Sequence, residues 1–435
     1  MSDESPRVAS PDEVDTWVRH AFDLTRVGAA DDARQWMERA AASGHRQAPI
    51  FAAIWRLVGY AGPVEPGAAQ SLLERAIQNG EPLGYTLLAA LAVSDLQGPR
   101  DWDLALSRLV RAAQLDEPRA LLQLALLLPE GDPDRSLLIH AAATRGEGTA
   151  RYFHGRTLFA SVDEGERAEG LRWLAEMASR GEPCSAILLA GRHAALPVIA
   201  LPEVPRPVEL DWDTVGGRIL WPHERPLPPV LVQRESPRIA KVAGLLTRDE
   251  CHYLMSRGAS YLQPAQVAGH GGNATVSTIR SNDSMVFSAA DTDVVVQSID
   301  RRIADVLARP TEHGERLALL RYAPGQAYAP HCDWIDPSAP GKAQVVASQG
   351  QRVSTLLVYL NSEYEAGTTR FVRLGWSFRG EPGDALLWSN VMGDGSVDPR
   401  TLHAGEPPTA GQKWLLSKWM RDRPQLPQGL PDISK

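Results

Sequence analysis

The stretch YAPGQAYAPHCDW, residues 322–334, decides how the C-terminal half of this 435-residue chain is interpreted. It places His331 and Asp333 two residues apart. On a β-strand such residues project from the same face, so both side chains can point inward while Cys332 points away. A second histidine, His403, lies in TLHAGEPPTAGQKW. Two imidazoles and one carboxylate on one side of a metal are typical of mononuclear non-haem Fe(II) centres.

Lys413, ten residues after His403, extends this pattern. It follows a turn between Gly405 and Gly411 and opens the alternating stretch KWLLSKW, which predicts a strand. A lysine inside an apolar barrel is costly unless an anion neutralises it. Three protein ligands leave room on the metal for a 2-oxo acid, which can chelate two positions, and for dioxygen. We therefore interpret Lys413 as the docking cation for the far carboxylate of an acidic co-substrate.

An isolated His-x-Asp tripeptide is a weak signal, because such tripeptides usually mark a loop or a solvated strand. The conjunction of His331 and Asp333 with His403, Lys413 and their aromatic, glycine-punctuated surroundings is much harder to obtain by chance. We therefore predict that these four side chains meet in one site.

From about Ser236 to Arg423 the sequence resembles the prolyl 4-hydroxylase-like branch of the Fe(II) and 2-oxoglutarate-dependent dioxygenases. The resemblance rests on the order and spacing of the motifs SPRIAKVAGLLTRDEC, STIRSND, LLRYAPGQAYAPHCDW, QRVSTLLVYLNSEYEAGTTRF, EPGDALLWSN and DPRTLHAGEPPTAGQKWLLSKWM. It implies a double-stranded β-helix, a jelly-roll of two facing antiparallel sheets, with helices packed against one side.

The resemblance also implies roles for individual residues. His331, Asp333 and His403 would be the ligands of Fe(2+), and Lys413 would pair with the distal carboxylate of 2-oxoglutarate. Dioxygen would be the second substrate, and ascorbate the reductant that rescues oxidised iron.

Other positions carry weaker expectations. Tyr322 and Tyr359 match positions that line the co-substrate pocket, although a strand tyrosine is more often a core residue with its hydroxyl at the rim. Arg280 matches a basic position near the active-site mouth and could contact the substrate. An arginine on an exposed strand edge is, however, at least as often a solvated charge with no such function. Where the family usually carries paired glycines, this chain has Ala366 before Gly367.

Asp398 and Thr401 precede His403 closely enough either to orient its ring or to cap the turn before it. Capping is the simpler of the two functions.

Composition and charge narrow the class of protein. The length predicts two or three domains, and 43% hydrophobic with 23% charged residues is ordinary globular usage. Lys and Arg number 45 against 53 Asp and Glu, and the net charge of -8 disfavours nucleic acid as the main partner. No stretch approaches the roughly 20 apolar residues of a membrane helix, and the polar, acidic N-terminus MSDESPRVASPDE does not look like a secretory signal.

Three cysteines, Cys184, Cys251 and Cys332, are too few and too scattered for a disulfide framework or a zinc site. This usage predicts a reducing cytoplasm, a setting that also suits ferrous iron.

The N-terminal region contains a recurring unit of small and apolar residues at helical spacing that ends in an alanine run and a turn. Its copies are ARQWMERAAASGH, AQSLLERAIQNGEP, ALSRLVRAAQLDEP, SLLIHAAATRGEG and GLRWLAEMASRGEP. Their turn residues, Gly44, Gly80, Asp116, Gly146 and Gly181, lie 36, 36, 30 and 35 residues apart. A period near 36 indicates stacked helical hairpins, and the units resemble degenerate Sel1-type repeats of the tetratricopeptide class. A non-repetitive helical bundle is the alternative, favoured only by the short third interval, which makes the fourth unit shorter than the others.

These patterns predict four segments: an all-α helical-repeat solenoid over residues 1–194, a proline-rich linker over 195–235, a dioxygenase domain over 236–424 and a mobile tail over 425–435. The solenoid would offer a concave surface to a protein or peptide partner, or act as a rigid spacer. Because the linker contains Trp212 and Trp221, we expect it to pack partly on the catalytic domain.

The sequence thus predicts an oxidoreductase that hydroxylates a carbon atom and favours prolyl residues of a protein or peptide. Two alternatives remain open at this point. The same mechanism can act on a free amino acid or small metabolite, or the chain can be a non-catalytic adaptor whose repeats bind a partner.

Overall fold

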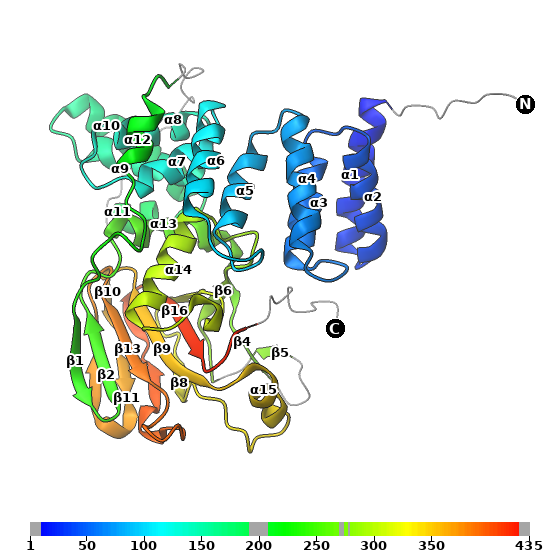
Figure 1. The fold of residues 1–435 in the computed structure, drawn as a ribbon. Coiled ribbons are helices and arrows are strands. Elements are labelled where there is room, and N and C mark those ends of the chain that lie inside the picture. The colour runs from blue at the N-terminus through cyan, green and yellow to red at the C-terminus, as the bar shows by residue number, and fades with distance from the viewer. Residues whose placement is uncertain (1–9, 191–207, 269–273, 277–278, 426–435) are drawn as a thin grey trace, which may run out of the picture.

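The computed structural model describes residues 10–190, 208–268, 274–276 and 279–425. Its first part is an array of eleven antiparallel helices joined by short turns, and Figure 1 shows them standing side by side in chain order. Their bounds are α1 Pro11–Arg26, α2 Ala30–Ala42, α3 Ala48–Val58, α4 Pro66–Gln78, α5 Leu83–Ala92, α6 Trp102–Gln114, α7 Pro118–Leu127, α8 Pro133–Thr144, α9 Gly148–Phe159, α10 Glu164–Ser179 and α11 Pro183–Leu189.

The turns of this array are where the period predicted them. All five predicted turn residues adopt the left-handed conformation, with φ of 84° at Gly44, 77° at Gly80, 60° at Asp116, 96° at Gly146 and 83° at Gly181. That conformation ends a helix and suits glycine or a short polar residue. Several of the next helices begin with a carboxylate that accepts hydrogen bonds from the first-turn amides, as at Glu117, Glu147 and Glu182.

Small residues let the hairpins pack closely. Ala76 and Ala112 are fully buried in the seams, as the repeat pattern predicts. In the hairpin of α9 and α10, a Cβ atom on Gly170 would lie 2.6 Å from the carbonyl oxygen of Gly155 and 2.3 Å from the amide nitrogen of Phe159. The backbones touch there, so only glycine fits.

The second part is built on antiparallel sheets. Its strands are β1 Val230–Glu235, β2 Arg238–Val242, β3 Gln263–Pro264, β4 Gln266–Ala268, β5 Ala274–Val276, β6 Asp283–Val286, β7 Ala318–Tyr322, β8 Tyr328–His331, β9 Arg352–Tyr359, β10 Tyr364–Ala366, β11 Thr369–Phe371, β12 Trp376–Phe378, β13 Ala385–Ser389, β14 His403–Gly405, β15 Pro408–Gly411 and β16 Lys413–Arg421. Four further helices, α12 Trp212–Gly217, α13 Arg248–Gly258, α14 Val294–Val306 and α15 Lys342–Gln349, accompany them.

Two of these sheets enclose a core. The larger has the order β1-β2-β13-β9-β16-β7-β6-β3 and the smaller β12-β11-β14-β8. Side chains from both, among them Tyr359 and Leu415 from the large sheet and Phe371 from the small one, form a single buried cluster between them. The other face of the large sheet is covered by α13 and α14 (Figure 1). The predicted order of a helical solenoid followed by an antiparallel β-domain with helices on one side is therefore confirmed.

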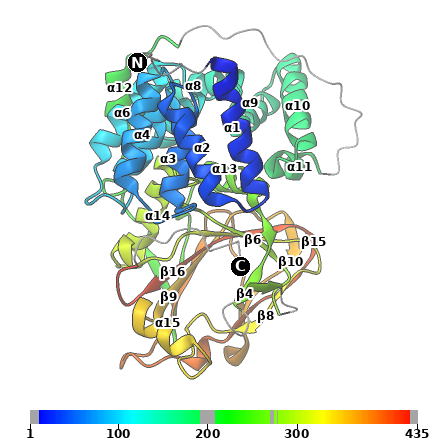
Figure 2. The same ribbon diagram turned by 90° about the vertical axis from the view of Figure 1, so that its right-hand side faces the viewer.

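The two parts share one hydrophobic core, which runs from α7 and α9 through α13 and α14 to the large sheet. Polar contacts reinforce the boundary. Asp249 on α13 accepts hydrogen bonds from Arg135 at 2.5 Å and pairs with Arg156 at 2.7 Å, and the side-chain oxygen of Gln123 on α7 accepts from the backbone amide of Val294 at the start of α14 at 3.1 Å. Figure 2 shows α13 and α14 lying between the helical layer and the sheets.

The segment between the two parts packs on both of them. Residues 195–207 lie outside the described residues, as do residues 426–435 of the predicted tail. Its first described part packs on the solenoid: the ring of Trp221 lies 5.0 Å from that of Trp102, and Arg225 donates to the carbonyl oxygen of Leu127 at 3.0 Å. Its end, Val230–Glu235, is strand β1 and pairs with β2 in the large sheet. The segment therefore packs partly on the β-domain, as expected, although Trp221 itself lies on the solenoid.

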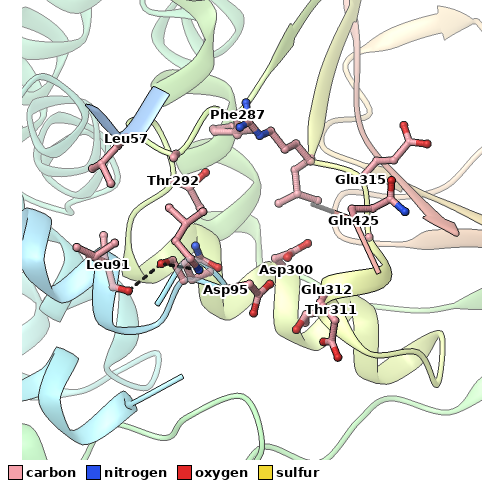
Figure 3. Close-up of a pocket in the computed structure, with 18 of the residues that line it drawn as sticks. Leu57, Leu91, Asp95, Phe287, Thr292, Asp300, Thr311, Glu312, Glu315 and Gln425 are labelled. Atoms are coloured by element: carbon pink, nitrogen blue, oxygen red, sulfur yellow. Dashed lines mark hydrogen bonds between the residues drawn. The ribbon is translucent and has the colours of Figure 1, made fainter. Parts of the chain in front are cut away.

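A cavity of about 170 Å³ lies where the solenoid and the β-domain diverge (Figure 3). Leu57 and Leu91 line it from the solenoid, and Phe287 lines it from the β-domain. Across its polar side the ammonium nitrogen of Lys418 is 2.6 Å from Asp300 Oδ1. None of the residues predicted to bind metal or co-substrate lines this cavity, so it is separate from the site described next.

Among the described residues, no helix combines the length and the apolar character needed to cross a membrane.

Candidate metal centre

Three of the predicted site residues meet in space. Strands β8 and β14 pair antiparallel so that His403 lies directly opposite His331. One potential ligand atom from each of His331, Asp333 and His403 lies within 4.8 Å of the others. Asp333 Oδ1 is 3.8 Å from His331 Nε2, and Asp333 Oδ2 is 3.7 Å from His403 Nε2. The structure therefore gathers two imidazoles and one carboxylate at one point, and among the described residues no other group of three such side chains is gathered in this way.

The local backbone differs from the predicted one. Strand β8 ends at His331, so Asp333 follows the strand and does not belong to it. It is still nearly buried, with 6% of its surface exposed, whereas Cys332 between the two residues is half-buried. The side chains converge because the chain turns inward after the strand, which the alternation rule alone does not describe.

Backbone carbonyls set the orientation of both imidazoles. His331 Nδ1 lies 2.8 Å from the carbonyl oxygen of Ala329, and His403 Nδ1 lies 2.9 Å from that of Thr401. A carbonyl oxygen only accepts, so both Nδ1 atoms carry the proton and both Nε2 atoms are left as metal ligands. The side chain of Asp398 caps the short helix Pro399–Thr401 and pairs with Arg400 at 2.6 Å. Of the two functions considered for Asp398 and Thr401, Asp398 caps the turn, and Thr401 orients His403 through its backbone.

The electrostatics of the cluster suit a cation. Burial, reinforced by the neighbouring His403, lowers the pKa of His331 to about 4, so its imidazole is neutral at pH 7. Burial alone would raise the pKa of Asp333, but His403, His331 and Arg352 outweigh it and the pKa is lowered. The cluster thus presents the neutral imidazole of His331 beside the ionised carboxylate of Asp333, and with His403 these residues form the two-histidine, one-carboxylate donor set of Fe(II) centres.

Lys413 is at the first position of β16 and is completely buried. Its ammonium nitrogen has no hydrogen-bond partner within the described part of the chain. Burial lowers its pKa to about 7, against a smaller opposing effect of Glu406. A buried ammonium without a partner is costly, and an incoming carboxylate would satisfy it. The residues therefore fit a dicarboxylate co-substrate.

Tyr322 and Tyr359 flank Lys413. The ammonium nitrogen is 5.2 Å from the ring centre of Tyr322 and 5.8 Å from that of Tyr359. The hydroxyl of Tyr359 is 2.8 Å from Thr369 Oγ1 and donates to the carbonyl oxygen of Phe378, so it is already engaged within the protein. Both rings therefore form walls beside Lys413, and only the hydroxyl of Tyr322 is without such a bond among the described residues.

Several residues of the site escaped prediction. The ring of Tyr328 stacks on His331, and the guanidinium carbon of Arg280 lies 4.9 Å from the centre of the Tyr328 ring. Arg280 is thus close to the cluster, as its position in the sequence suggests. On the other side of the cluster, Asp333 accepts a hydrogen bond from Thr355 on β9, which in turn is contacted by Asn390. Tyr328 could have been identified from the sequence, because it is an aromatic residue three positions before His331. Thr355 and Asn390 carried no such signal.

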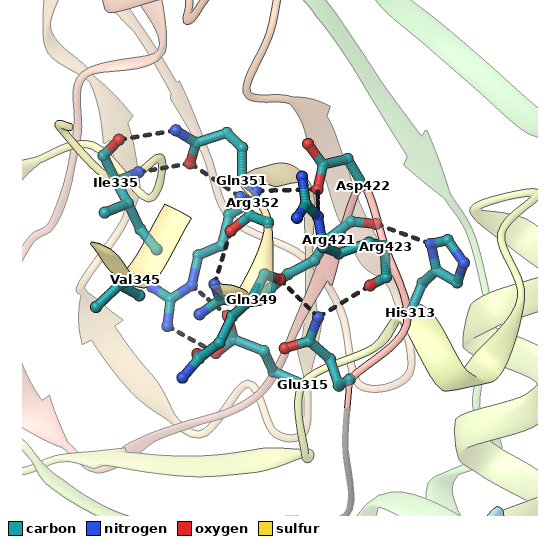
Figure 4. Close-up of polar contacts among 12 residues, drawn as sticks. His313, Glu315, Ile335, Val345, Gln349, Gln351, Arg352, Arg421, Asp422 and Arg423 are labelled. Atoms are coloured by element: carbon teal, nitrogen blue, oxygen red, sulfur yellow. Dashed lines mark hydrogen bonds and ion pairs between the residues drawn. The ribbon is translucent and has the colours of Figure 1, made fainter. Parts of the chain in front are cut away.

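Figure 4 shows a charged network around Glu315 that includes Arg352, a residue that also acts on Asp333. Glu315 receives two bonds from Arg352, at 2.6 and 2.7 Å, and one from Arg421 at 2.7 Å. Arg352 also stacks over Trp419 at 4.4 Å. Arg352 contributes to lowering the pKa of Asp333, so this network connects electrostatically to the site.

The departure from paired glycines has a structural cost. Ala366 adopts φ 56°, next to Gly367 at φ 65°. An alanine in the left-handed region is strained by about 1–2 kcal/mol. The turn therefore keeps the conformation for which glycine is suited, without the glycine at its first position.

Comparisons with known proteins agree with this site. Residues 317–421, which contain all four predicted site residues, match the 2OG-Fe(II) oxygenase superfamily. Prolyl 4-hydroxylase 1 of Arabidopsis thaliana is 33% identical over 203 residues, which cover 43% of this chain and 70% of the relative. A putative prolyl 4-hydroxylase of Acanthamoeba polyphaga mimivirus is 31% identical over 180 residues, covering 41% and 72%.

Solved structures show similarity to each half. The viral collagen prolyl hydroxylase of Paramecium Bursaria Chlorella virus-1 in complex with 2OG is 24% identical, with a TM-score of 0.33, and the match covers 42% of this chain and 95% of that one. A Sel1 repeat protein from Oxalobacter formigenes is 17% identical, with a TM-score of 0.34 and a coverage of 41% and 79%.

Proposed function

The chain belongs to the 2OG-Fe(II) oxygenase superfamily, in the group of the prolyl 4-hydroxylases, and from this premise we propose that it hydroxylates prolyl residues of a protein or peptide. Dioxygen and 2-oxoglutarate would be consumed in the reaction. The observation that carries the proposal is the convergence of His331, Asp333 and His403 beside the unpartnered ammonium group of Lys413.

Each of these residues has a defined task. The Nε2 atoms of His331 and His403 and the carboxylate of Asp333 would hold Fe(2+), which supplies the activation of dioxygen and of the target C–H bond when bound. Lys413 would bind the distal carboxylate of 2-oxoglutarate between the rings of Tyr322 and Tyr359.

The aromatic side chains around His403 keep bulk water away from it. The ring of Trp388 lies 4.8 Å from the imidazole and that of Phe371 5.7 Å, and both side chains are fully buried. A water-poor site strengthens the ion pairs inside it and protects reactive species from side reactions. The stacked pair of Tyr328 and Arg280 borders the half-buried side of the cluster, so we assign the contact with the substrate to that side.

Three further points belong to the proposal. Ascorbate would serve as the reductant that restores ferrous iron. A reducing cytoplasm is supported by the thiols of Cys184, Cys251 and Cys332, all of which are free. The net charge of -8 supports a protein or peptide substrate over nucleic acid.

The test is turnover by the purified full-length chain with Fe(II), 2-oxoglutarate and a panel of proline-containing peptides, compared with free proline and other amino acids. We expect succinate release that depends on iron, and peptides that gain the mass of one oxygen atom on proline. Oxygen incorporation only into a free amino acid would favour the small-metabolite alternative. If no condition gives iron-dependent succinate release, the proposed activity is wrong and the non-catalytic adaptor is the remaining alternative.

The matched variants are Lys413→Ala and His403→Ala. Loss of Lys413 should raise the KM for 2-oxoglutarate while Fe(II) still binds, whereas loss of His403 should abolish both iron binding and turnover. Thermal unfolding of each variant without metal shows whether the fold has survived the substitution.

A further inference from the structure

Two polar side chains lie directly behind the carboxylate of Asp333. Thr355 belongs to β9 and Asn390 follows the end of β13, and both are fully buried. Thr355 Oγ1 is 2.7 Å from Asp333 Oδ2, and Asn390 Nδ2 is 2.9 Å from Thr355 Oγ1. Neither side chain reaches solvent, so their hydrogen bonds have no competition from bulk water.

The direction of these bonds follows from their chemistry. An ionised carboxylate can only accept, so the single hydroxyl proton of Thr355 must point to Asp333. The amide group of Asn390 donates to the lone pair of Thr355 and thereby prevents the hydroxyl from turning away. Asn390 thus fixes Thr355, and Thr355 fixes one oxygen of Asp333.

The two oxygens of Asp333 are otherwise equivalent toward the cluster. Oδ1 lies 3.8 Å from His331 Nε2 and Oδ2 lies 3.7 Å from His403 Nε2, so either oxygen, or both, would be within reach of one metal ion. Among the residues that the structure describes, only Oδ2 has a short hydrogen bond. We propose that Thr355, held by Asn390, is a positioning residue. Its hydrogen bond occupies Oδ2 of Asp333, so that Oδ1 would be the only oxygen of this carboxylate to bind the metal. The inference rests on the proposed iron centre and adds the residue that decides how the carboxylate binds.

The backbone of Asn390 extends the same support to His403. Its carbonyl oxygen accepts from the amide of Asp398 at 2.9 Å, and the carbonyl oxygen of Asp398 accepts from the hydroxyl of Thr401 at 2.7 Å. The carbonyl oxygen of Thr401 in turn accepts from His403 Nδ1 at 2.9 Å. One residue therefore holds the carboxylate through its side chain and the distant histidine through its backbone.

The experiment measures Co(II) binding to the full-length protein in the absence of 2-oxoglutarate, by calorimetry and by the visible absorption of the bound ion. Thr355→Val keeps the shape of the side chain and removes the hydroxyl, and Thr355→Ser keeps the hydroxyl. We expect the valine variant to bind Co(II) about 10- to 100-fold more weakly, the usual effect of losing a hydrogen bond to a ligand. Its absorption should also weaken, because a carboxylate free to bind through both oxygens raises the coordination number. The serine variant should restore both readouts.

Ser417→Ala is the matched control, because this buried hydroxyl on β16 has no hydrogen-bond partner among the described residues. It should leave both the affinity and the spectrum unchanged. If the valine variant is too unstable to purify, Asn390→Leu tests the same point, since it frees the hydroxyl of Thr355 to rotate and should shift both readouts in the same direction.

The outcomes separate this inference from the proposed function. Wild-type affinity and spectrum in Thr355→Val, or in Asn390→Leu where that variant replaces it, overturn the positioning role and leave the metal centre standing. A wild-type protein that does not bind Co(II) overturns the metal centre and the inference together. Equal losses in Thr355→Val and Ser417→Ala show a general packing effect and also overturn the inference.

Discussion

The ring of Tyr328 lies flat against the imidazole of His331, with the ring centres 3.4 Å apart and the planes inclined by 12°. The imidazole is therefore fixed from two sides, by this ring and by the carbonyl oxygen of Ala329 at Nδ1. A ligand held in this way loses little rotational freedom when it binds metal.

The first prediction concerns this stack. Tyr328→Ala should weaken Mn(II) binding about 2- to 12-fold, because an aromatic contact of this kind is worth about 0.5–1.5 kcal/mol. Tyr328→Phe keeps the ring and should bind as the wild type does. Titration calorimetry on the two variants measures the difference, and equal affinities would show that the ring does not orient His331.

The second prediction concerns the stability of the protein without co-substrate. The folded pKa of Lys413 is about 7, below the ordinary value of 10.5. Between these two values the unfolded chain binds the extra proton, so raising the pH stabilises the folded state. Lys413→Met should therefore be more stable than the wild type at pH 6, by an amount on the order of a few kcal/mol, and this gap should close as the pH approaches 10.5.

Urea unfolding from pH 6 to pH 10 measures that gap, and Lys342→Met on α15 controls for the loss of a lysine elsewhere. A gap between the wild type and Lys413→Met that does not change with pH would contradict the buried charge.

The third prediction concerns co-substrate affinity. If the ammonium form of Lys413 binds the distal carboxylate, 2-oxoglutarate must bind together with a proton once the pH exceeds about 7. The dissociation constant should then rise by up to about tenfold per pH unit above that point. Calorimetry in buffers of different ionisation enthalpy detects the proton uptake directly. Lys413→Arg, whose charge persists at high pH, should show weaker binding but no such rise.

The fourth prediction concerns Glu315, whose side chain neutralises two guanidinium groups. Burial raises its pKa, but Arg352 and Arg421 outweigh this effect and the pKa is lowered. Glu315→Gln removes the counter-charge of the buried Arg421 and the half-buried Arg352, and should cost about 3 kcal/mol of unfolding free energy at pH 7. Since a lowered folded pKa contributes stability that is lost on acidification, the difference should shrink as the pH falls below 4.5.

The control for Glu315 is Glu235→Gln, because the Glu235 side chain is 82% exposed in its ion pair. Its substitution should change stability by less than about 0.5 kcal/mol. A comparable loss in both variants would show that the network in Figure 4 contributes no more than a surface pair.

The fifth prediction concerns the boundary between the two parts of the molecule. Gln123→Leu removes the acceptor for the first amide of α14 and leaves that donor buried, at a cost of about 1–3 kcal/mol. Because solenoid and β-domain share a core, hydrogen exchange should accelerate in α7 and α14 together. Gln114→Leu, at an exposed position of α6, should affect neither. Faster exchange confined to α7 would show that the two parts unfold independently.

The candidate site was largely predictable from the sequence, because a metal centre needs particular residue types and these are rare in combination. His331, Asp333, His403 and Lys413 are distinctive as residues, whereas Thr355 is one threonine in an apolar strand. Its function depends on its position opposite Asp333, which only the pairing of distant segments determines. Asp333 itself reaches the cluster by a turn that strand alternation does not describe.

The repeat architecture was predictable for a different reason. Each hairpin ends at a residue that must adopt a left-handed conformation, so the turns recur at a readable period. What could not be predicted is which surface of the solenoid contacts the β-domain. The contacts of Gln123, Arg135 and Arg156 with the β-domain do not follow the repeat, and the linker around Trp221 packs on the solenoid for the same non-periodic reason.

The contacts of the solenoid with α13 and α14 limit how this chain can be shortened. Helices α5, α7, α9 and α11 all contact α13 or α14, so removing one of their hairpins would break these contacts. The first hairpin, α1 and α2, extends past the β-domain (Figure 1). Removing α1 and α2 would therefore leave the contacts of Gln123, Arg135 and Arg156 with the β-domain in place.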